Sequence, residues 1–282
     1  MRLAIASGKG GTGKTLVATN LAWHLARAGS EVTYVDTDVE APNGHLFLHP
    51  DGVEETRFVV PIPALRQGTC SGCGACQEIC GFNAILSLKD RVMVFPELCH
   101  SCGACLLSCK ELALTEVGRE VGTLRRGTAE PGIRFWSAAI DVGEAKSTPL
   151  IAGLLDRAEA SAVTIIDAPP GTSCGATTVV RSADHVLLVT EPTPFGLHDL
   201  ELAVELCRAL GRPVSALINR SDLGDRRVHD WLERQSIPLL AELPFSREVA
   251  TAYARGELAA RTVDELRRSL DHIAGAVLEG AP

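Results

Sequence analysis

The sequence contains no run of roughly 18 apolar residues, the length that a membrane-spanning helix needs. It also lacks the design of a signal peptide, since Met1 leads directly into the strand-like apolar run Leu3 to Ala6. We therefore expect a cytoplasmic protein without membrane insertion.

Positively charged residues are fewer than negatively charged ones. Lys and Arg together number 27 against 35 Asp and Glu, which gives a formal net charge of -8. Non-specific binding to nucleic acid depends on neutralising phosphates, so this balance argues against a nucleic-acid partner. Only five of the 27 basic residues are lysines, and two of these, Lys9 and Lys14, lie in one loop.

Apolar strand-like runs alternate with amphipathic stretches at both ends of the chain. The predicted strands are Leu3–Ser7, Val32–Asp36, Ile133–Ile140, Val163–Asp167, His185–Thr190, Val214–Asn219 and Pro238–Leu243. The predicted helices include Leu16–Ala28, Leu197–Leu210, Val228–Gln235 and Val263–Leu278. Apolar strands separated by helices indicate βαβ units, and hence an α/β fold with a doubly wound, mostly parallel sheet.

A middle segment interrupts this alternation and holds eight of the ten cysteines. Two cysteine runs, Cys70–Cys80 and Cys99–Cys109, repeat at a spacing of 29 residues. Each run leads into a short stretch predicted as a hairpin, around Lys89-Asp90 and around Gly118-Arg119. We predict one α/β domain made of residues 1–55 and 125–282, with a small α+β domain inserted at residues 56–124.

The stretch that follows the first predicted strand fits the pattern G-x-x-x-x-G-K-[ST] and opens a predicted helix. It consists of Gly8, Lys9, Gly10, Gly11, Thr12, Gly13, Lys14 and Thr15. Glycines let the backbone wrap a phosphate at a helix N-terminus, Lys14 reaches the β- and γ-phosphates, and the Thr15 hydroxyl ligates Mg²⁺. The sequence therefore predicts a site for ATP or ADP with Mg²⁺.

The loop also contains an extra lysine, Lys9, in the form K-G-G-T-G-K-T. In this it resembles the deviant Walker A ATPases, the MinD/ParA/Mrp group and the nitrogenase iron protein. The resemblance implies a P-loop NTPase fold of the MinD-like (SIMIBI) class and an ATP-dependent dimer in which Lys9 reaches the nucleotide of the partner subunit. The dimer is either a homodimer or a heterodimer with a pseudo-homologous chain.

Two further segments match that family in the expected order. Asp36, Asp38 and Asn43 are similar to its switch I, which implies that Asp38 positions the attacking water, Asp36 supports Mg²⁺, and Asn43 contacts phosphate or the partner. A helix-capping role is the alternative for Asp38. The segment from Asp167 to Gly171 is similar to Walker B and switch II, with Asp167 holding Mg²⁺ through water and the Gly171 N–H near the γ-phosphate.

The adenine side of the site is expected at the ends of the last two predicted strands. Asn219 and Arg220 match the position at which the family recognises adenine, and Pro244 is expected to pack on the base. Lys9, Lys14 and Asp38 are thus the predicted catalytic residues.

The pattern C-x-x-C-x-x-C-x-x-x-C is typical of bacterial ferredoxins, in which the fourth cysteine of each run serves the other cluster. One 4Fe-4S cluster is therefore expected on Cys70, Cys73, Cys76 and Cys109, and a second on Cys80, Cys99, Cys102 and Cys105. Zinc and disulfides are the alternatives; zinc ligands usually occur as two distant pairs, and disulfides need an oxidising compartment. Gly81 and Lys110 stand where a proline commonly follows the fourth cysteine.

Two cysteines lie outside the array. Cys207 is expected in the core, on the apolar face of a helix. Cys174 follows the switch aspartate at the spacing of a cysteine that ligates a bridging cluster in the nitrogenase iron protein. We weigh an interface cluster or redox role for Cys174 against a buried thiol at a helix start.

The motifs predict an ATPase that couples its nucleotide state to electron transfer through two 4Fe-4S clusters, with an unidentified redox partner. An alternative is an iron–sulfur carrier or assembly ATPase similar to the Mrp group, whose partner accepts clusters, although the C-terminal C-x-x-C of that group is absent. A second alternative is a MinD- or ParA-like positioning ATPase.

Overall fold

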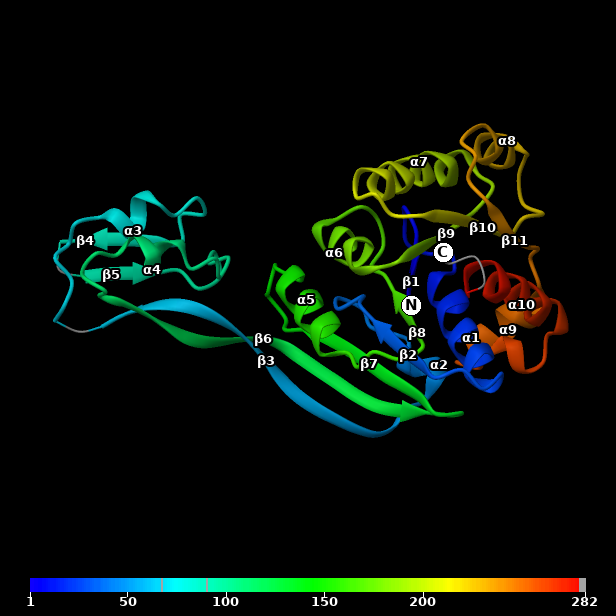
Figure 1. Cartoon of the computed structure of the whole chain (residues 1–282), viewed down its shortest axis with the longest axis horizontal. Helices are drawn as coiled ribbons and strands as arrows, with labels where there is room; N and C mark the ends of the chain where they lie inside the picture. The colour runs from blue at the N-terminus through cyan, green and yellow to red at the C-terminus, as the bar shows by residue number, and fades with distance from the viewer. Residues whose placement is uncertain (67, 90, 279–282) are drawn as a thin grey trace. The chain divides into compact units, whose positions relative to one another are not determined.

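The computed structural model describes residues 1–66, 68–89 and 91–278, which form two compact units (Figure 1). Unit 1 comprises Met1–Thr56, Leu124–Ala139 and the chain from Ser147 onward; unit 2 comprises Arg57–Thr123 and Ile140–Lys146. The second segment of unit 2 lies outside the insert predicted at 56–124. Asp90 of the predicted hairpin and residues 279–282 of the predicted α/β domain lie outside the described residues.

A parallel sheet forms the centre of unit 1. Its strands are β1 (Arg2–Ala6), β2 (Val32–Asp36), β7 (Ile133–Ile140), β8 (Val163–Asp167), β9 (His185–Thr190), β10 (Val214–Asn219) and β11 (Leu239–Leu243). They lie in the order β11-β10-β9-β1-β8-β2-β7, with every neighbouring pair parallel. The register between β2 and β8 places Asp36 opposite Asp167. The prediction of a doubly wound, mostly parallel sheet is confirmed.

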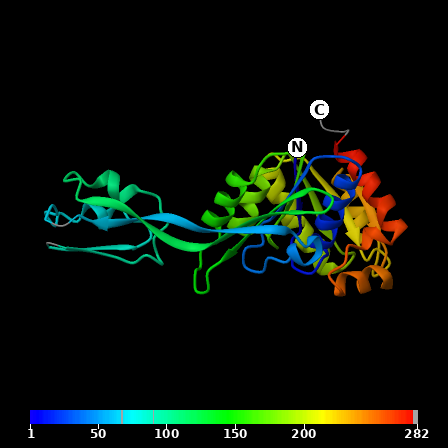
Figure 2. The ribbon, with the colours of Figure 1, turned by 90° about the horizontal axis from the view of Figure 1, so that it is seen from below.

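Helices cover both faces of this sheet (Figures 1 and 2). On one face lie α1 (Lys14–Arg27), α9 (Arg247–Ala254), η1 (Ala259–Arg261) and α10 (Asp264–Leu278); on the other lie α5 (Thr148–Arg157), α6 (Cys174–Ser182) and α7 (Pro194–Ala209). The helix α8 (Arg227–Arg234) packs on α7, and the short α2 (His45–Leu48) packs on α1. Alternate strand residues such as Leu3 and Ile5 point toward α1 and α10 and form one continuous apolar core.

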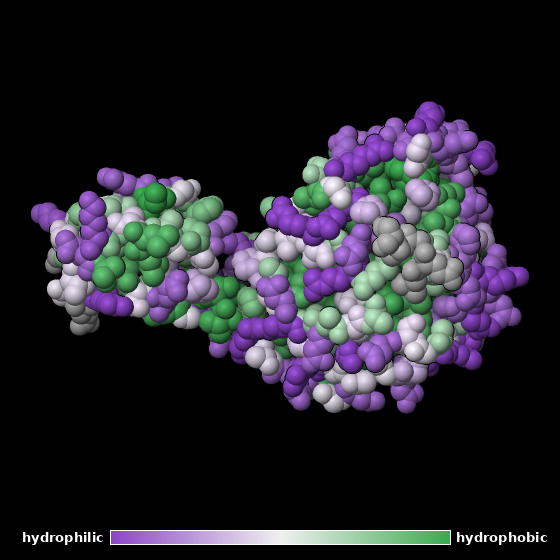
Figure 3. All heavy atoms as spheres, in the orientation of Figure 1, coloured by the Kyte–Doolittle hydropathy of each residue, from purple (hydrophilic) through white to green (hydrophobic). Residues whose placement is uncertain are grey.

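Unit 2 has much less core. It contains α3 (Ala75–Glu78), the antiparallel hairpin of β4 (Ile85–Leu88) and β5 (Arg91–Val94), and α4 (Ala104–Ser108). One small buried cluster consists of Cys76, Ile85 and Leu114, and Phe58, Val60 and Val121 are also buried. Figure 3 shows a patch of apolar surface on this unit. Among the exposed apolar side chains of the unit is Leu107, at 90% exposure.

Two long strands, β3 (Asp51–Leu65) and β6 (Leu114–Ala129), extend the sheet beyond β7. The predicted hairpin around Gly118-Arg119 is wrong, because both residues lie within β6. Much of β3 is exposed, and charged side chains join β3 to β6 in the ion pairs Glu54–Arg126 and Glu55–Arg125. Charges in place of alternating apolar residues explain why β3 was not predicted and why β6 was not predicted as one long strand. The hairpin at Lys89 is confirmed as the β4–β5 connection.

Candidate functional site

The loop between β1 and α1 depends on glycine at two positions. Gly13 precedes α1 with φ +98°, and a Cβ there would lie 2.5 Å from the Asn219 Nδ2 atom. A Cβ on Gly8 would lie 2.0 Å from the carbonyl oxygen of Asp199 in α7. The loop can therefore keep this path only without side chains at these positions, and it ends with the free N–H groups of a helix N-terminus, which attract anions.

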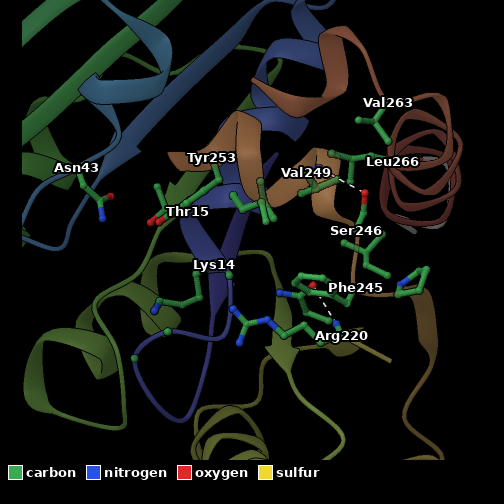
Figure 4. Close-up of a pocket in the computed structure, with 18 of the residues that line it drawn as sticks. Lys14, Thr15, Asn43, Arg220, Phe245, Ser246, Val249, Tyr253, Val263 and Leu266 are labelled. Carbon is green, nitrogen blue, oxygen red and sulfur yellow. Dashed lines mark hydrogen bonds between the residues drawn. The ribbon is translucent and has the colours of Figure 1, made fainter. Parts of the chain in front are cut away.

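A pocket of about 360 Å³ lies against this loop (Figure 4). Ten of the predicted site residues line it, namely Gly10, Gly11, Gly13, Lys14, Thr15, Asp38, Asn43, Asn219, Arg220 and Pro244. Six do not: Gly8, Lys9, Thr12, Asp36, Asp167 and Gly171. The pocket thus brings together residues from the loop, from the segment after β2, and from the ends of β10 and β11.

The far side of the pocket is formed by residues that the sequence did not single out. Phe245, Val249, Tyr253 and Leu266 line it, and the Ser246 Oγ atom caps α9 by accepting the N–H of Val249 at 3.3 Å (Figure 4). An aromatic residue directly after Pro244 was the one available signal for Phe245. Tyr253 lies on a helix without any motif, so only the fold brings it to the site.

Two buried carboxylates lie behind the loop. Asp36 accepts the N–H groups of Asp38, Asn43 and Gly44 at 3.1, 2.9 and 2.8 Å. Burial raises the pKa of Asp36, and the charge of Asp167 raises it further, while the three N–H groups lower it. Burial also raises the pKa of Asp167, against hydrogen bonds and charges that lower it, including the Thr15 hydroxyl. A cation between these carboxylates would remove the cost of burying them both charged.

Burial likewise raises the pKa of Asp38, and the ammonium of Lys14 opposes that rise. Lys14 is itself buried, at 7% exposure, so its charge acts on Asp38 with little screening. The arrangement puts one positive and one negative group on the wall of the same pocket.

Three buried polar atoms near the loop have no hydrogen-bond partner among the described residues: Thr12 Oγ1, Asn43 Oδ1 and Asp167 Oδ1. Buried polar atoms normally have partners, so these three fit a site that a ligand completes. The second oxygen of Asp167 is held by the buried hydroxyl of Tyr34, which donates to Oδ2 at 3.0 Å. The residues therefore fit Mg²⁺ with a nucleotide, and Tyr34 is a positioning residue that sequence reasoning missed.

Lys9 points to the end of β9 instead of the pocket. Its Nζ atom lies 3.2 Å from the Glu191 carboxylate, which also pairs with Arg220 at 2.6 Å. Asn219 donates from Nδ2 to the carbonyl of Thr12 at 2.8 Å, so in this structure it holds the loop. Glu191 thereby joins the extra lysine to the predicted adenine side.

The predicted switch II contacts the start of the loop. The Gly171 N–H donates to the carbonyl of Ser7 at 3.0 Å, and this bond must open before the N–H can meet a phosphate. Cys174 is exposed as the first residue of α6, and Cys207 is fully buried in α7, where burial raises its pKa to about 11. The expectation of a core position for Cys207 is confirmed, whereas of the two interpretations weighed for Cys174 the buried thiol is wrong.

The eight remaining cysteines line two separate cavities of unit 2. One cavity is lined by Cys70, Cys73, Cys76 and Cys109, and the other by Cys80, Cys99, Cys102 and Cys105. Each cavity thus takes three cysteines from one run and the fourth from the other run.

Backbone N–H groups already point at the sulfurs. Cys80 and Cys109 accept the N–H of Ala84 and Ala113, both at 3.3 Å, while Cys70 and Cys99 accept further N–H groups at 3.4 Å. Within the described residues, no three or more His, Cys, Asp or Glu side chains converge as they would on a single metal ion. Each set of four is instead arranged around a cavity, with backbone N–H groups donated to its sulfurs, as in cluster sites. The residues present therefore fit a cluster.

Comparison with known proteins shows the family of the chain. The family described as the CobQ/CobB/MinD/ParA nucleotide binding domain matches residues 3–259. The chain belongs to this family. As a CobQ/CobB/MinD/ParA protein it is a P-loop ATPase with a nucleotide-binding domain.

Proteins similar to this chain include an uncharacterized protein, an iron-sulfur cluster carrier and a MinD ATPase. The uncharacterized protein MJ0579 of Methanocaldococcus jannaschii is 25% identical over 99% of this chain and 98% of its own length. An iron-sulfur cluster carrier protein of Aquifex aeolicus is 25% identical over 90% of this chain and 60% of its own length. The crystal structure of the cell division ATPase MinD of Pyrococcus furiosus superposes with a TM-score of 0.61 at 21% identity, covering 99% of both chains. At that identity the superposition establishes the MinD-like fold alone. Among the described residues, no helix is both long and apolar enough to cross a membrane.

Proposed function

We propose that this MinD/ParA-family ATPase uses its nucleotide state to control electron transfer through two 4Fe-4S clusters held in unit 2. One observation carries the proposal: the two cysteine sets, interleaved in the sequence, line two separate cavities with four sulfurs each. Chance placement of eight cysteines would not sort them by the ferredoxin rule.

On the nucleotide side, the family's chemistry assigns a role to each residue of the pocket. Backbone N–H groups of the loop and Lys14 bind the phosphates, and Thr15, Asp36 and Asp167 support Mg²⁺. Asp38, on the wall of the pocket, orients the attacking water. Lys9 leaves Glu191 to reach the nucleotide of a partner subunit in an ATP-dependent dimer.

On the cysteine side, the four sulfurs of each set hold one cluster, which supplies one-electron redox chemistry when it is bound. The N–H groups at Cys70, Cys80, Cys99 and Cys109 stabilise the thiolates. An external redox protein exchanges electrons with these sites.

Switch II connects the two activities within our proposal. Gly171 gives up its bond to Ser7 when the γ-phosphate is present, and this change moves the segment that leads to Cys174 at the start of α6. Cys174 is exposed, so a role at a dimer interface remains open to it.

The comparisons favour a MinD-like positioning ATPase as the second candidate, because MinD proteins recur among the relatives and solved structures. A carrier of iron–sulfur clusters is the third, supported by the named carriers among the relatives. Four protein ligands at each cavity favour resident clusters over cargo, since a transferred cluster has to leave its ligands.

The test is anaerobic purification followed by iron, zinc and sulfide analysis. We expect about eight irons per chain and a broad absorbance near 400 nm that dithionite bleaches. Stoichiometric zinc without iron would reject the electron-transfer proposal and leave the positioning ATPase. ATP-dependent transfer of iron to an apo-acceptor, leaving the donor empty, would favour the carrier instead.

A further inference from the structure

The two cysteine runs of unit 2 are repeats in sequence, yet their first loops are held differently. In the loop Cys70–Cys73, Gly72 has φ +71°, and a Cβ there would lie 1.5 Å from the carbonyl oxygen of Lys89 in the β4–β5 hairpin. In the loop Cys99–Cys102, the corresponding residue is Ser101, with φ +54°. The backbone of Lys89 therefore packs directly against the first loop, whereas the second loop has room for a side chain.

The second loop is held by a lysine from another part of the chain. The Lys146 Nζ atom donates to the carbonyl oxygen of Glu97 at 2.7 Å and to that of Cys99 at 3.0 Å, across 47 residues of sequence in the second case. No other lysine of the described chain bonds to the carbonyl of a cysteine in either set. Lys146 thus breaks the symmetry of the repeat.

Lys146 is fixed in place by its own segment. Arg57 bonds to both oxygens of Asp141, at 3.0 and 2.5 Å, and Arg119 pairs with Glu144 at 2.5 Å. Glu144 in turn accepts the backbone N–H of Lys146 at 3.2 Å. These contacts tie the segment Ile140–Lys146 to unit 2 and hold the lysine over the Cys99 loop.

The charge of Lys146 is not neutralised locally. Within the described residues, no carboxylate lies within ion-pair distance of its ammonium. Its charge lies against the loop, because the ammonium donates directly to the carbonyl oxygens of Glu97 and Cys99. Reduction of a cluster adds one negative charge, so a fixed cation nearby favours the reduced form.

We propose that Lys146 makes the two sites unequal by raising the reduction potential of the site formed by Cys80, Cys99, Cys102 and Cys105 above that of the other. An electron that enters unit 2 then rests at this second site. The inference depends on the proposed function, since it requires that both sites hold clusters. Lys146 also stands immediately before Ser147 and α5, so the chain leads from the tuned site directly into the ATPase unit.

The test compares Lys146→Met with Lys146→Arg and with Lys110→Met, a control that removes a lysine next to Cys109 of the first set. Each full-length protein is prepared anaerobically, its iron is counted, and its two clusters are titrated with dithionite under electron paramagnetic resonance. We expect Lys146→Met to lower the equilibrium constant for reduction of the second cluster about tenfold. For one electron this corresponds to a reduction potential that is about 59 mV lower. Lys146→Arg retains most of the original potential, and Lys110→Met leaves the second cluster unchanged.

Assignment of the signals uses Cys73→Ser and Cys102→Ser, which each alter one cluster. Equal shifts of both clusters, or no shift in a Lys146→Met protein with full iron, would overturn the proposal. Loss of iron from the second set alone would also overturn it, because Lys146 would then build the loop and not tune it. A wild-type protein without iron would instead reject the proposed function itself.

Discussion

The two units of this chain bury different kinds of side chains. Unit 1 has an apolar core of more than a dozen strand and helix side chains, such as Ile165, Leu187 and Leu270, all fully buried. Unit 2 buries a small cluster of Cys76, Ile85 and Leu114, with further cysteines such as Cys80 packed around it, and a few separate side chains such as Phe58 and Val121. An apolar core stabilises the first unit, whereas cysteine side chains make up much of the small buried cluster of the second.

The difference has a thermodynamic consequence. A single core in a unit of this size rarely supplies more than a few kcal/mol of stability, and natural domains this small often add metals or disulfides. All eight cysteines of unit 2 are free thiols in this structure. Cluster binding is therefore expected to supply much of the folding free energy of unit 2 and almost none of that of unit 1.

Removal of iron should have the largest of the predicted effects, because it should unfold unit 2 and leave unit 1 folded. We expect anaerobic chelation to abolish amide-hydrogen protection in Arg57–Thr123 and Ile140–Lys146, while unit 1 stays folded. Tryptophan fluorescence reports on unit 1 alone, since Trp23, Trp136 and Trp231 all lie in it. Protected amides in iron-free unit 2 would show that its small core suffices.

Nucleotide-site variants should have the converse effect. Lys14→Ala is expected to weaken ATP binding at least about a hundredfold, because it removes the buried cation that our proposal assigns to the phosphates, and to leave the iron content unchanged. Asp38→Asn should retain binding and lower hydrolysis about a hundredfold or more, since it removes the group that orients water. Isothermal titration and phosphate release measure the two effects. Normal hydrolysis by Asp38→Asn would contradict the switch I assignment.

The sequence predicted most of unit 1 because its features are local. Five of the seven strands in the parallel sheet, from Val32–Asp36 to Val214–Asn219, have the predicted bounds, and the P-loop motif lies where a strand meets a helix. The cysteine sets could also be assigned, because spacing alone decides which sulfurs can share a cavity.

What the sequence missed depends on contacts between distant residues. The strand β3 carries charges in place of the alternation that marks a strand, and β6 was mistaken for a short hairpin, because the ion pairs that join the two strands are visible only in the fold. Tyr34, Phe245 and Lys146 belong to no motif. Each acts through a partner that the tertiary structure supplies.

Stability against pH should also separate the units. The pKa values of Asp36 and Asp167 are raised in the folded state, chiefly by burial, so folded unit 1 retains protons that the unfolded chain has released. Nucleotide-free unit 1 is therefore most stable below the ordinary carboxyl range and loses stability as the pH rises through the raised values. Asp36→Asn should make the stability of unit 1 less dependent on pH between about pH 5 and about pH 8, because the amide does not titrate.

Urea unfolding followed by tryptophan fluorescence measures this difference without a contribution from unit 2. Asp156→Asn, an exposed aspartate on α5, is the matched control and should change stability little at either pH. A protein whose unit 1 became more stable as the pH rose would contradict the sign. Saturating Mg²⁺ and nucleotide should remove most of the pH dependence, because the cation compensates both carboxylates.

The smallest effect is expected from Tyr34→Phe. The variant removes one hydroxyl, whose bond to Asp167 Oδ2 leaves Oδ1 free for the metal shell. Loss of this buried bond should cost about 1 kcal/mol of unit 1 stability and lower Mg²⁺ affinity about tenfold, with the iron content unchanged. Tyr253→Phe is the control: its ring lies against Phe47 and lines the pocket, but its hydroxyl bonds to no described residue. Manganese binding measured by electron paramagnetic resonance should separate the two variants, and equal affinities would mean that Tyr34 only fills space beneath the carboxylate.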